Sequence, residues 1–313
     1  MNPFRPAPTA NGPRLCCTDL LIVLVVVLWA VNLSVIKIGL RVLTPHAFNA
    51  VRLGLAALAY LAVLLARRTR FRPGRRGDGW KAAGLGLLGI TFYQVFFIRG
   101  VSMMNASTAS VVMGTSPIFI ALLATAVGEE RVTWAGIAIS FGGFLLVLSG
   151  ENGGWVFTWA AWRGAFLILL ANACWAGYTV FSKPVLDRNA AFDLAAGGTV
   201  AGTAVYLPFA AGDLLRTDWA AVPWQGWAAI AYAGLVAIFL CFVLWYQSVK
   251  KVGAAKTGVY GNLTPILAIL FAGRILGERL TAVQAAGAAV TLAGVYLTRS
   301  GYRFFERRGQ RIP

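Results

Sequence analysis

The sequence predicts an all-α integral membrane protein with ten transmembrane helices, arranged as two inverted-topology five-helix repeats. The composition, ten apolar segments and an internal repeat support this prediction. Of the 313 residues, 58% are hydrophobic and 12% are charged, and the mean hydropathy is +0.71. Soluble domains carry about 25% charged residues. Half that share of charge on so apolar a chain predicts that it lies in a lipid bilayer.

Ten segments are long and apolar enough to be candidate membrane spans. A helix needs about 20 mostly apolar residues to cross a hydrocarbon core of roughly 30 Å. In chain order the segments are residues 18–38, 46–66, 80–100, 103–126, 132–149, 162–183, 191–211, 224–249, 253–275 and 280–298. The first run reaches span length and no small-residue cleavage site stands clear of it. We therefore expect it to be retained rather than removed as a signal peptide.

The basic residues predict the orientation of these spans. With a cytoplasmic N-terminus, 20 of the 28 Lys and Arg residues fall on the cytoplasmic side and six on the opposite side, with Lys37 and Arg52 inside spans. The positive-inside rule then predicts a multi-pass protein of the cell inner membrane with both termini in the cytoplasm. The net charge of +17 follows from this topology. We expect no nucleic-acid partner, because no soluble domain presents a groove.

Self-comparison shows an internal repeat. Residues 29–37 read WAVNLSVIK and residues 175–183 read WAGYTVFSK, 146 positions later. Ser-Pro-Ile at 116–118 likewise matches Thr-Pro-Ile at 264–266. Each copy holds five spans, and an odd number inserts the second copy upside down, the architecture of alternating-access transporters. The predicted division is a cytoplasmic N-terminal segment 1–17, a first repeat 18–149, an outer loop 150–161, a second repeat 162–298 and a basic cytoplasmic tail 299–313.

Further motifs recur in both copies and point to a family. Each copy opens with Trp-Ala and Lys, carries a mid-span Pro, and continues with a Gly-Glu-Arg turn and a pair of glycines. The turn reads Gly-Glu-Glu-Arg at 128–131 and Gly-Glu-Arg at 277–279. The copies resemble the EamA domain of the drug/metabolite transporter superfamily over about residues 18–298. Within that superfamily the chain looks most like the YddG-type aromatic amino acid exporters.

Polar and aromatic side chains inside the spans predict a central chamber. Deep tryptophans do not fit an interfacial belt, and a buried Asn, Gln or Tyr in a membrane needs a partner and should face the bundle interior. The expected substrate-binding residues are Trp29, Asn32, Tyr93, Gln94, Trp175, Tyr178, Tyr246, Tyr260 and Asn262. The alternative is that these side chains hold neighbouring helices together.

Two prolines occupy equivalent mid-span positions in the two copies. Each one deprives the carbonyl four residues earlier, at Met113 and Gly261, of its helical hydrogen bond. Such sites are either hinges and carbonyl acceptors along a central pathway, or kinks satisfied by a neighbouring hydroxyl. Two lysines at repeat-equivalent positions near opposite faces suit an architectural or gating role. The predicted hinge and gating residues are Pro117, Pro265, Lys37 and Lys183.

The charged side chains limit the mechanism. No Asp or Glu lies in the middle of a predicted span, and the only histidine, His46, sits at the mouth of the second. Proton-coupled pumps generally need an intramembrane carboxylate, so we predict uncoupled or weakly coupled movement of a neutral or zwitterionic solute. Lys37, Arg52 and Arg99 lie toward the outer ends of their spans. There they could attract a substrate carboxylate, extend to the interface or cap helix C-termini, and extension to the interface is favoured for Arg99.

These observations predict an exporter of amino acids, with aromatic and neutral side chains favoured, working by alternating access. The alternative is an exporter of another small metabolite or drug; a lipid flippase or scaffold is a third. An enzyme is not expected, because the chain offers no nucleophile with its base, no paired carboxylates and no His ligand set. No cofactor or metal is expected. The partners are a small-molecule substrate and the bilayer, and a monomer can function because one chain supplies both halves.

Overall fold

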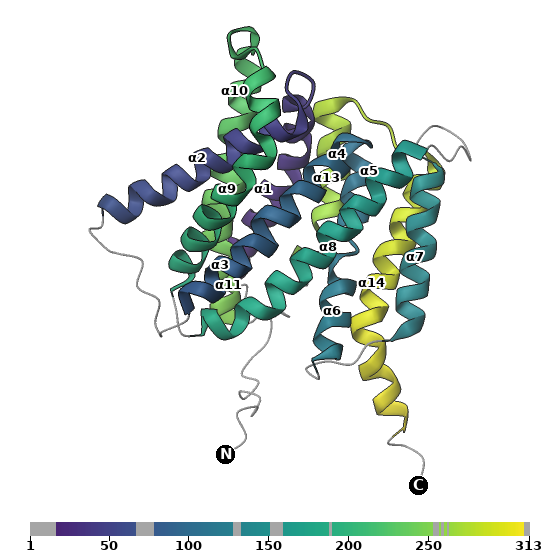
Figure 1. The fold of residues 1–313 in the computed structure, drawn as a ribbon. Coiled ribbons are helices and arrows are strands. Elements are labelled where there is room, and N and C mark those ends of the chain that lie inside the picture. The colour runs from purple at the N-terminus through teal and green to yellow at the C-terminus, as the bar shows by residue number, and fades with distance from the viewer. Residues whose placement is uncertain are drawn as a thin grey trace.

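The computed structural model describes residues 17–66, 78–127, 133–150, 159–187, 190–252, 257, 260–261 and 263–309. These residues are all-helical and contain no strand (Figure 1). The helices are α1 (Cys17–Gly39), α2 (Pro45–Ala66), α3 (Asp78–Gly86), η1 (Leu87–Phe92), α4 (Tyr93–Ser102), α5 (Ala106–Met113), α6 (Ser116–Ala126), α7 (Trp134–Ser149), α8 (Trp159–Leu186), α9 (Ala191–Arg216), η2 (Trp219–Ala221), α10 (Trp224–Ala231), η3 (Tyr232–Leu240), α11 (Cys241–Val252), α13 (Leu263–Leu276) and α14 (Ala282–Gly309).

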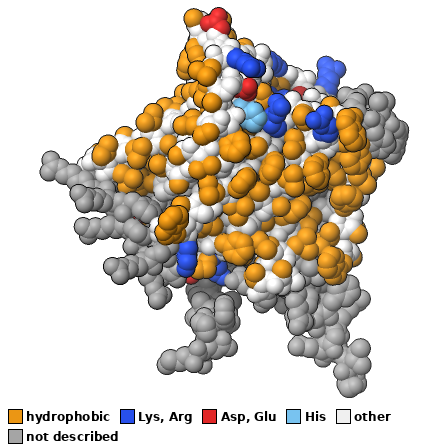
Figure 2. Space-filling view, viewed as in Figure 1, with side chains coloured by type: hydrophobic (Ala, Val, Ile, Leu, Met, Phe, Trp, Pro, Cys, Tyr) orange, Lys and Arg blue, Asp and Glu red, His pale blue; other side chains and the backbone are white. Residues whose placement is uncertain are grey.

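Seven helical stretches of the described chain are long and apolar enough to cross a membrane. They are Thr18–Gly39, Pro45–Ala66, Gly79–Ser102, Ala106–Ala126, Trp159–Leu186, Ala191–Arg216 and Trp224–Lys251. Three shorter apolar helices are Trp134–Ser149, Leu263–Leu276 and Ala282–Thr298. Figure 2 shows a broad band of exposed apolar side chains with Lys and Arg gathered above and below it. The multi-pass membrane fold is therefore confirmed, while the count of ten spans stays a prediction.

Two of the predicted spans contain π-helical segments. The segment η1 separates α3 from α4, and η3 separates α10 from α11. The sequence predicted spans at 80–100 and 224–249, and only the structure shows the π-helical segments within them. A π turn holds more residues than an α turn, which rotates the side chains that follow relative to those before. The residues after each segment therefore face directions that a regular helix would not give them.

The fourth predicted span, 103–126, is also divided. It consists of α5 and α6, which are joined by a turn at residues 114–115, and Pro117 lies in the first turn of α6. A proline is tolerated there because the N–H it lacks would have no helical partner. Pro117 therefore begins a helix instead of kinking one. The last helix differs too: α14 runs to Gly309 instead of ending at 298, because hydropathy marks the end of the apolar segment and not of the helix.

The helices α7 and α14 lie side by side and run in opposite directions (Figure 1). A Cβ built on Gly136 would lie 2.3 Å from the amide nitrogen of Thr298, and one on Gly143 would lie 2.3 Å from that of Thr291. Residue numbers thus rise along one helix and fall along the other. The two backbones approach this closely because glycines occupy the contact, as in other membrane helix pairs.

A second pair of helices, α2 and α9, is also antiparallel. The helix α2 packs along α9, and the pairs Tyr60–Phe192 and His46–Tyr206 show that these two helices are also antiparallel. The helix α1 packs against η3, α11 and α13, while α8 packs against η1, α4 and α6. The first helix begins and the last ends on one side of the bundle (Figure 1), which we call the termini face.

Candidate functional site

A cavity of about 370 Å³ lies at the centre of the bundle and is lined by residues of α1, α2, α4, α5, α6, α8, η3, α11 and α13. Ala124, Lys183 and Val249 belong to its wall and lie near the ends of α6, α8 and α11. These ends approach the termini face (Figure 1). The cavity therefore extends from the middle of the bundle toward that face.

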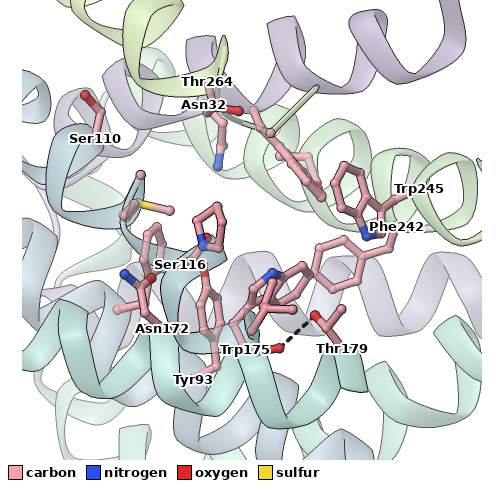
Figure 3. A pocket seen from close by; sticks show the side chains of 18 of the residues that line it. Asn32, Tyr93, Ser110, Ser116, Asn172, Trp175, Thr179, Phe242, Trp245 and Thr264 are labelled. Atoms are coloured by element: carbon pink, nitrogen blue, oxygen red, sulfur yellow. Dashed lines mark hydrogen bonds between the residues drawn. The ribbon is translucent and has the colours of Figure 1, made fainter. Parts of the chain in front are cut away.

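Most of the residues predicted from sequence lie in the wall of this cavity. Asn32, Tyr93 and Trp175 surround it in Figure 3. The complete set of predicted residues that line it is Trp29, Asn32, Tyr93, Gln94, Trp175, Pro117, Pro265 and Lys183. They come from both predicted repeats. Segments far apart in the sequence thus contribute to one cavity.

Five predicted residues are not among those that line the cavity. Tyr178 and Tyr246 are 1% and 3% exposed and pack against each other behind the wall, with ring centroids 5.9 Å apart. Tyr260 is half-buried against the same core cluster. Lys37 reaches the connection between α4 and α5 instead. Asn262 lies outside the described residues.

The displaced tyrosines have a physical explanation. Tyr178 lies one helical turn beyond Trp175, yet its ring faces η1, where a Cβ on Gly89 would lie 2.4 Å from the ring. Trp245, the residue before Tyr246, lines the cavity, and Tyr246 does not. Adjacent helical residues point about 100° apart, and the π-helical η3 just before them offsets the phase that a regular α-helix predicts.

Replacing Tyr178 with Ala is therefore expected to lower stability before it changes substrate recognition. Truncating a buried aromatic side chain costs about 3–5 kcal/mol. Asn32→Ala, in the cavity wall, is the matched comparison and should change the KM for substrate with a smaller loss of thermal stability. Thermal unfolding of the detergent-solubilised protein and transport kinetics separate the two effects. If the Tyr178→Ala protein had an unchanged melting temperature but a raised KM, Tyr178 would instead belong to the substrate-binding site.

The aromatic side chains form a continuous wall. The ring centroids of Trp29 lie 6.2 Å from Trp175 and 5.0 Å from Trp245, and those of Tyr93 and Trp175 lie 5.5 Å apart. The indole Nε1 of Trp29 donates to the carbonyl oxygen of Ala237 in η3, at 2.9 Å. Because this N–H is satisfied by the protein, Trp29 presents chiefly apolar ring surface to the cavity.

Asn172 is a wall residue that sequence reasoning missed. Its Nδ2 donates to the carbonyl oxygen of Val112 at 3.0 Å and to Thr115 Oγ1 at 3.1 Å. It thereby joins α8 to the turn between α5 and α6. The signal was available, because residues 172, 175 and 179 follow the three- and four-residue spacing of one helix face. Phe242 and Trp245, which are spaced by three, were also missed as binding residues. Figure 3 shows both in the cavity wall, and the ring centroids of Phe242 and Trp175 lie 6.0 Å apart.

The two predicted hinge prolines, Pro117 and Pro265, both line the cavity. A Cβ on Gly114 would lie 2.6 Å from Cγ of Pro265, so the turn before Pro117 packs directly on α13. Met113 and Gly261, whose carbonyls the prolines leave without a helical partner, also line the cavity. Backbone acceptors and neighbouring hydroxyls are thus gathered at the middle of the bundle.

The described wall carries two basic side chains, Arg52 and Lys183, and no Asp or Glu. Arg52 is 1% exposed, which excludes the interpretation that it extends to the membrane interface. Arg99 is exposed and is not among the lining residues. The cavity is therefore apolar and aromatic with a positive electrostatic bias, a combination that suits a solute with an apolar body and an anionic group.

The connection between α4 and α5 is held by two charged side chains on the face opposite the termini. Lys37 Nζ donates to the carbonyl oxygens of Val101 and Met104, at 3.1 and 2.8 Å. Glu278 accepts from the amides of Ala106 and Ser107, at 2.8 and 2.9 Å. The cation thus meets the end of α4 and the anion meets the start of α5, as the helix dipoles favour.

This geometry agrees with the comparison to known proteins. The EamA-like transporter family model matches residues 17–149 and again residues 162–300. The chain belongs to the EamA-like transporter family. A protein of Archaeoglobus fulgidus, named an uncharacterized transporter, is 29% identical over 90% of this chain and 96% of its own length. This relative and a Bacillus subtilis protein that is also similar to this chain are both named as transporters.

The chain is also similar to a further curated protein and to a solved structure. A Streptantibioticus cattleyicolor protein named a probable terminal-alkyne amino-acid exporter is 30% identical over 88% of this chain and 91% of its own length. A solved crystal structure with 19% identity covers 92% of this EamA-like chain and 97% of its own, with a TM-score of 0.65. At that identity the structural likeness shows a shared fold alone.

Proposed function

We propose that this EamA-family transporter exports amino acids, with aromatic and neutral side chains favoured, across the cell inner membrane. The observation that carries the proposal is the central cavity. Its volume of about 370 Å³ falls within the range of roughly 300–1,000 Å³ for small-molecule sites. The rings of Trp29, Trp175 and Trp245 offer faces for an apolar or aromatic side chain, while amides and carbonyls can hydrogen-bond the polar end.

The similarity to the Streptantibioticus cattleyicolor protein supports amino acids as the substrate class, because that relative is named a probable amino-acid exporter. The resemblance to YddG-type exporters of aromatic amino acids favours the aromatic members of the class. Both are arguments from likeness, and the site residues give the independent chemical reason. The ring faces of the wall offer contact area to a planar apolar side chain.

Alternating access is the proposed mechanism. The antiparallel pairs α7–α14 and α2–α9 are those expected if two five-helix repeats of opposite topology share one bundle. In this state the cavity extends toward the termini face, where Lys183 lines it, while the repeat-equivalent Lys37 holds the opposite face. Exchanging these two environments between the halves gives a second state that opens on the other side. The positive-inside rule makes the termini face cytoplasmic.

The proposal is tested by uptake and counterflow of labelled amino acids in proteoliposomes, with and without a proton gradient. We expect saturable phenylalanine flux that the gradient does not change, because no Asp or Glu of the described wall can carry a proton. Thr179 lines the cavity and Phe166 is 62% exposed on the same helix, α8. Thr179→Trp should therefore abolish flux, and Phe166→Trp should preserve it.

Three results would overturn different parts of this proposal. Absence of flux for every amino acid would overturn the substrate class and move the search to other small metabolites or drugs of the superfamily. Gradient-driven accumulation would overturn the uncoupled mechanism. Equal flux in the Thr179→Trp and Phe166→Trp proteins would show that the substrate does not pass through the central cavity.

A further inference from the structure

Arg52 is an arginine held inside the membrane-spanning bundle. It lies in the second turn of α2, is 1% exposed, and belongs to the wall of the central cavity. Its Cζ lies 5.6 Å from the ring centroid of Phe48 and 5.7 Å from that of Phe97. A guanidinium in such apolar surroundings is costly unless an anion accompanies it.

All hydrogen-bond partners of Arg52 in the described residues are neutral. Nε donates to Asn49 Oδ1 and Nη2 donates to Gln94 Oε1, both at 2.7 Å. No described Asp or Glu pairs with it. Its third nitrogen, Nη1, makes no hydrogen bond within the described part of the chain and is not among the enclosed unpartnered atoms, so it borders the cavity. Within the described residues, two amides thus orient the guanidinium and no carboxylate compensates its charge.

A purely structural role does not explain this arrangement. A neutral side chain could join Asn49 of α2 to Gln94 of α4 without the desolvation cost of a cation, which is several kcal/mol for a buried ion. A charge retained at that cost, with its donors fixed and one nitrogen open to a cavity, is suited to an anion that enters the cavity. Arginine is the side chain that binds carboxylates in the most directional way, since its fork of donors matches the two oxygens.

We infer that Arg52 binds the carboxylate of the transported substrate, an inference that rests on the proposed export of amino acids and names the group that the cavity recognises. The α6 helix starts at the same cavity, where Ser116 and Pro117 line it. The aromatic rings then face the substrate side chain.

The ammonium group of an amino acid has a separate place to bind. Both hydrogen-bond donations from Asn172 Nδ2 go to the protein, and its Oδ1 is not among the enclosed unpartnered atoms of the described chain. Figure 3 shows Asn172 in the cavity wall across from Thr264. The carbonyl oxygen of Asn172 and the faces of Tyr93 and Trp175 are acceptors for a cation. These acceptors are neutral, whereas Arg52 is charged, and hydrogen bonds between charged partners are the stronger ones. We therefore expect the carboxylate to contribute more to recognition than the ammonium.

The test compares analogues that lack one charged group. In counterflow with phenylalanine, 3-phenylpropionate keeps the carboxylate and phenethylamine keeps only the ammonium. The inference expects 3-phenylpropionate to compete and phenethylamine not to compete. Gln94→Glu places a carboxylate beside Nη2 with almost no change in volume. It should raise the KM for phenylalanine by about 30-fold or more, the usual effect of losing a buried charged hydrogen bond, and should let phenethylamine compete.

Two variants control this experiment. Arg52→Lys keeps the charge and should retain the preference for carboxylates with a smaller rise in KM. Arg99→Gln removes one positive charge from an exposed position on α4 and should change neither KM nor preference. A Gln94→Glu protein that is folded and keeps the wild-type KM and analogue preference would overturn the inference and leave amino acid export intact.

The inference and the proposed function fail separately. If the wild type transports no amino acid, the proposed function fails, and carboxylate recognition is tested by binding. Quenching of cavity tryptophan fluorescence is then measured with 3-phenylpropionate and phenethylamine on the purified wild-type and Arg52→Lys proteins, with Gln94→Glu as the comparison. Absence of carboxylate binding, or equal binding in wild type and Gln94→Glu, would overturn the inference as well.

Discussion

Replacing Gly143 with Leu is expected to leave little folded protein, while Gly142→Leu on the same helix is tolerated. A Cβ at Gly143 would lie 2.3 Å from the amide nitrogen of Thr291 and 2.7 Å from the carbonyl oxygen of Gly287, both backbone atoms of α14. Gly142 has nothing within 4 Å and is exposed. Overpacking a rigid contact costs about 1–3 kcal/mol or more, which is a large share of a typical stability of about 5–15 kcal/mol.

Size-exclusion profiles and thermal unfolding of the two solubilised variants measure this difference. The Gly142→Leu protein places an apolar side chain toward lipid and should elute and melt like the wild type. The Gly143→Leu protein must separate α7 from α14 along their whole contact and should aggregate or melt far lower. Equal melting temperatures for the pair would mean that the two helices do not approach as closely as the backbone distances indicate.

Replacing Glu278 with Gln is expected to open the cavity toward the face opposite the termini and to slow transport. The carboxylate accepts from the amides of Ala106 and Ser107 and, at 2.6 Å, from the Ser107 hydroxyl. Gly277, at φ +71°, makes the turn that directs it there. Hydrogen bonds to a charged group contribute about 1.5–3 kcal/mol. Their loss would shift the population of closed and open states by about 30-fold for roughly 2 kcal/mol.

Accessibility labelling measures that shift. Ser110 lines the cavity and lies one helical turn beyond Ser107 in α5. With the four native cysteines replaced, Ser110→Cys should react faster with a membrane-impermeant thiol reagent from that face when Glu278→Gln is present. Arg279→Gln, at an exposed neighbouring position, is the control and should leave the rate unchanged. Equal labelling in both backgrounds would show that Glu278 does not hold this face closed.

Several features of the fold were predictable because they depend on hydropathy alone. Every apolar segment of the sequence corresponds to a helix in the described residues, since a chain in lipid must satisfy its backbone hydrogen bonds internally. The family followed from rare residues at fixed spacing, such as Trp29 with Lys37 and Trp175 with Lys183. Rare residues carry this information because apolar residues exchange with one another freely.

The wall of the cavity was less predictable. Trp245 lines it and Tyr246 does not, although both are aromatic and one residue apart. The π-helical segment before them sets which one faces inward, and no composition signal marks such a segment. Pro117 marked a special backbone position correctly, yet only the structure shows that it starts α6. A proline is compatible with either a kink or a helix start.

The sequence by itself determined that this protein is a helical membrane transporter of the EamA-like family, because hydropathy and repeated rare residues suffice for that. Only the tertiary structure decided which polar side chains meet. Arg52 looked able to reach the interface, and it is instead enclosed between Asn49 and Gln94. Burial depends on where neighbouring helices pack, and those neighbours come from distant parts of the chain. A site that needs two helices in contact is therefore specified by packing, which local sequence does not display.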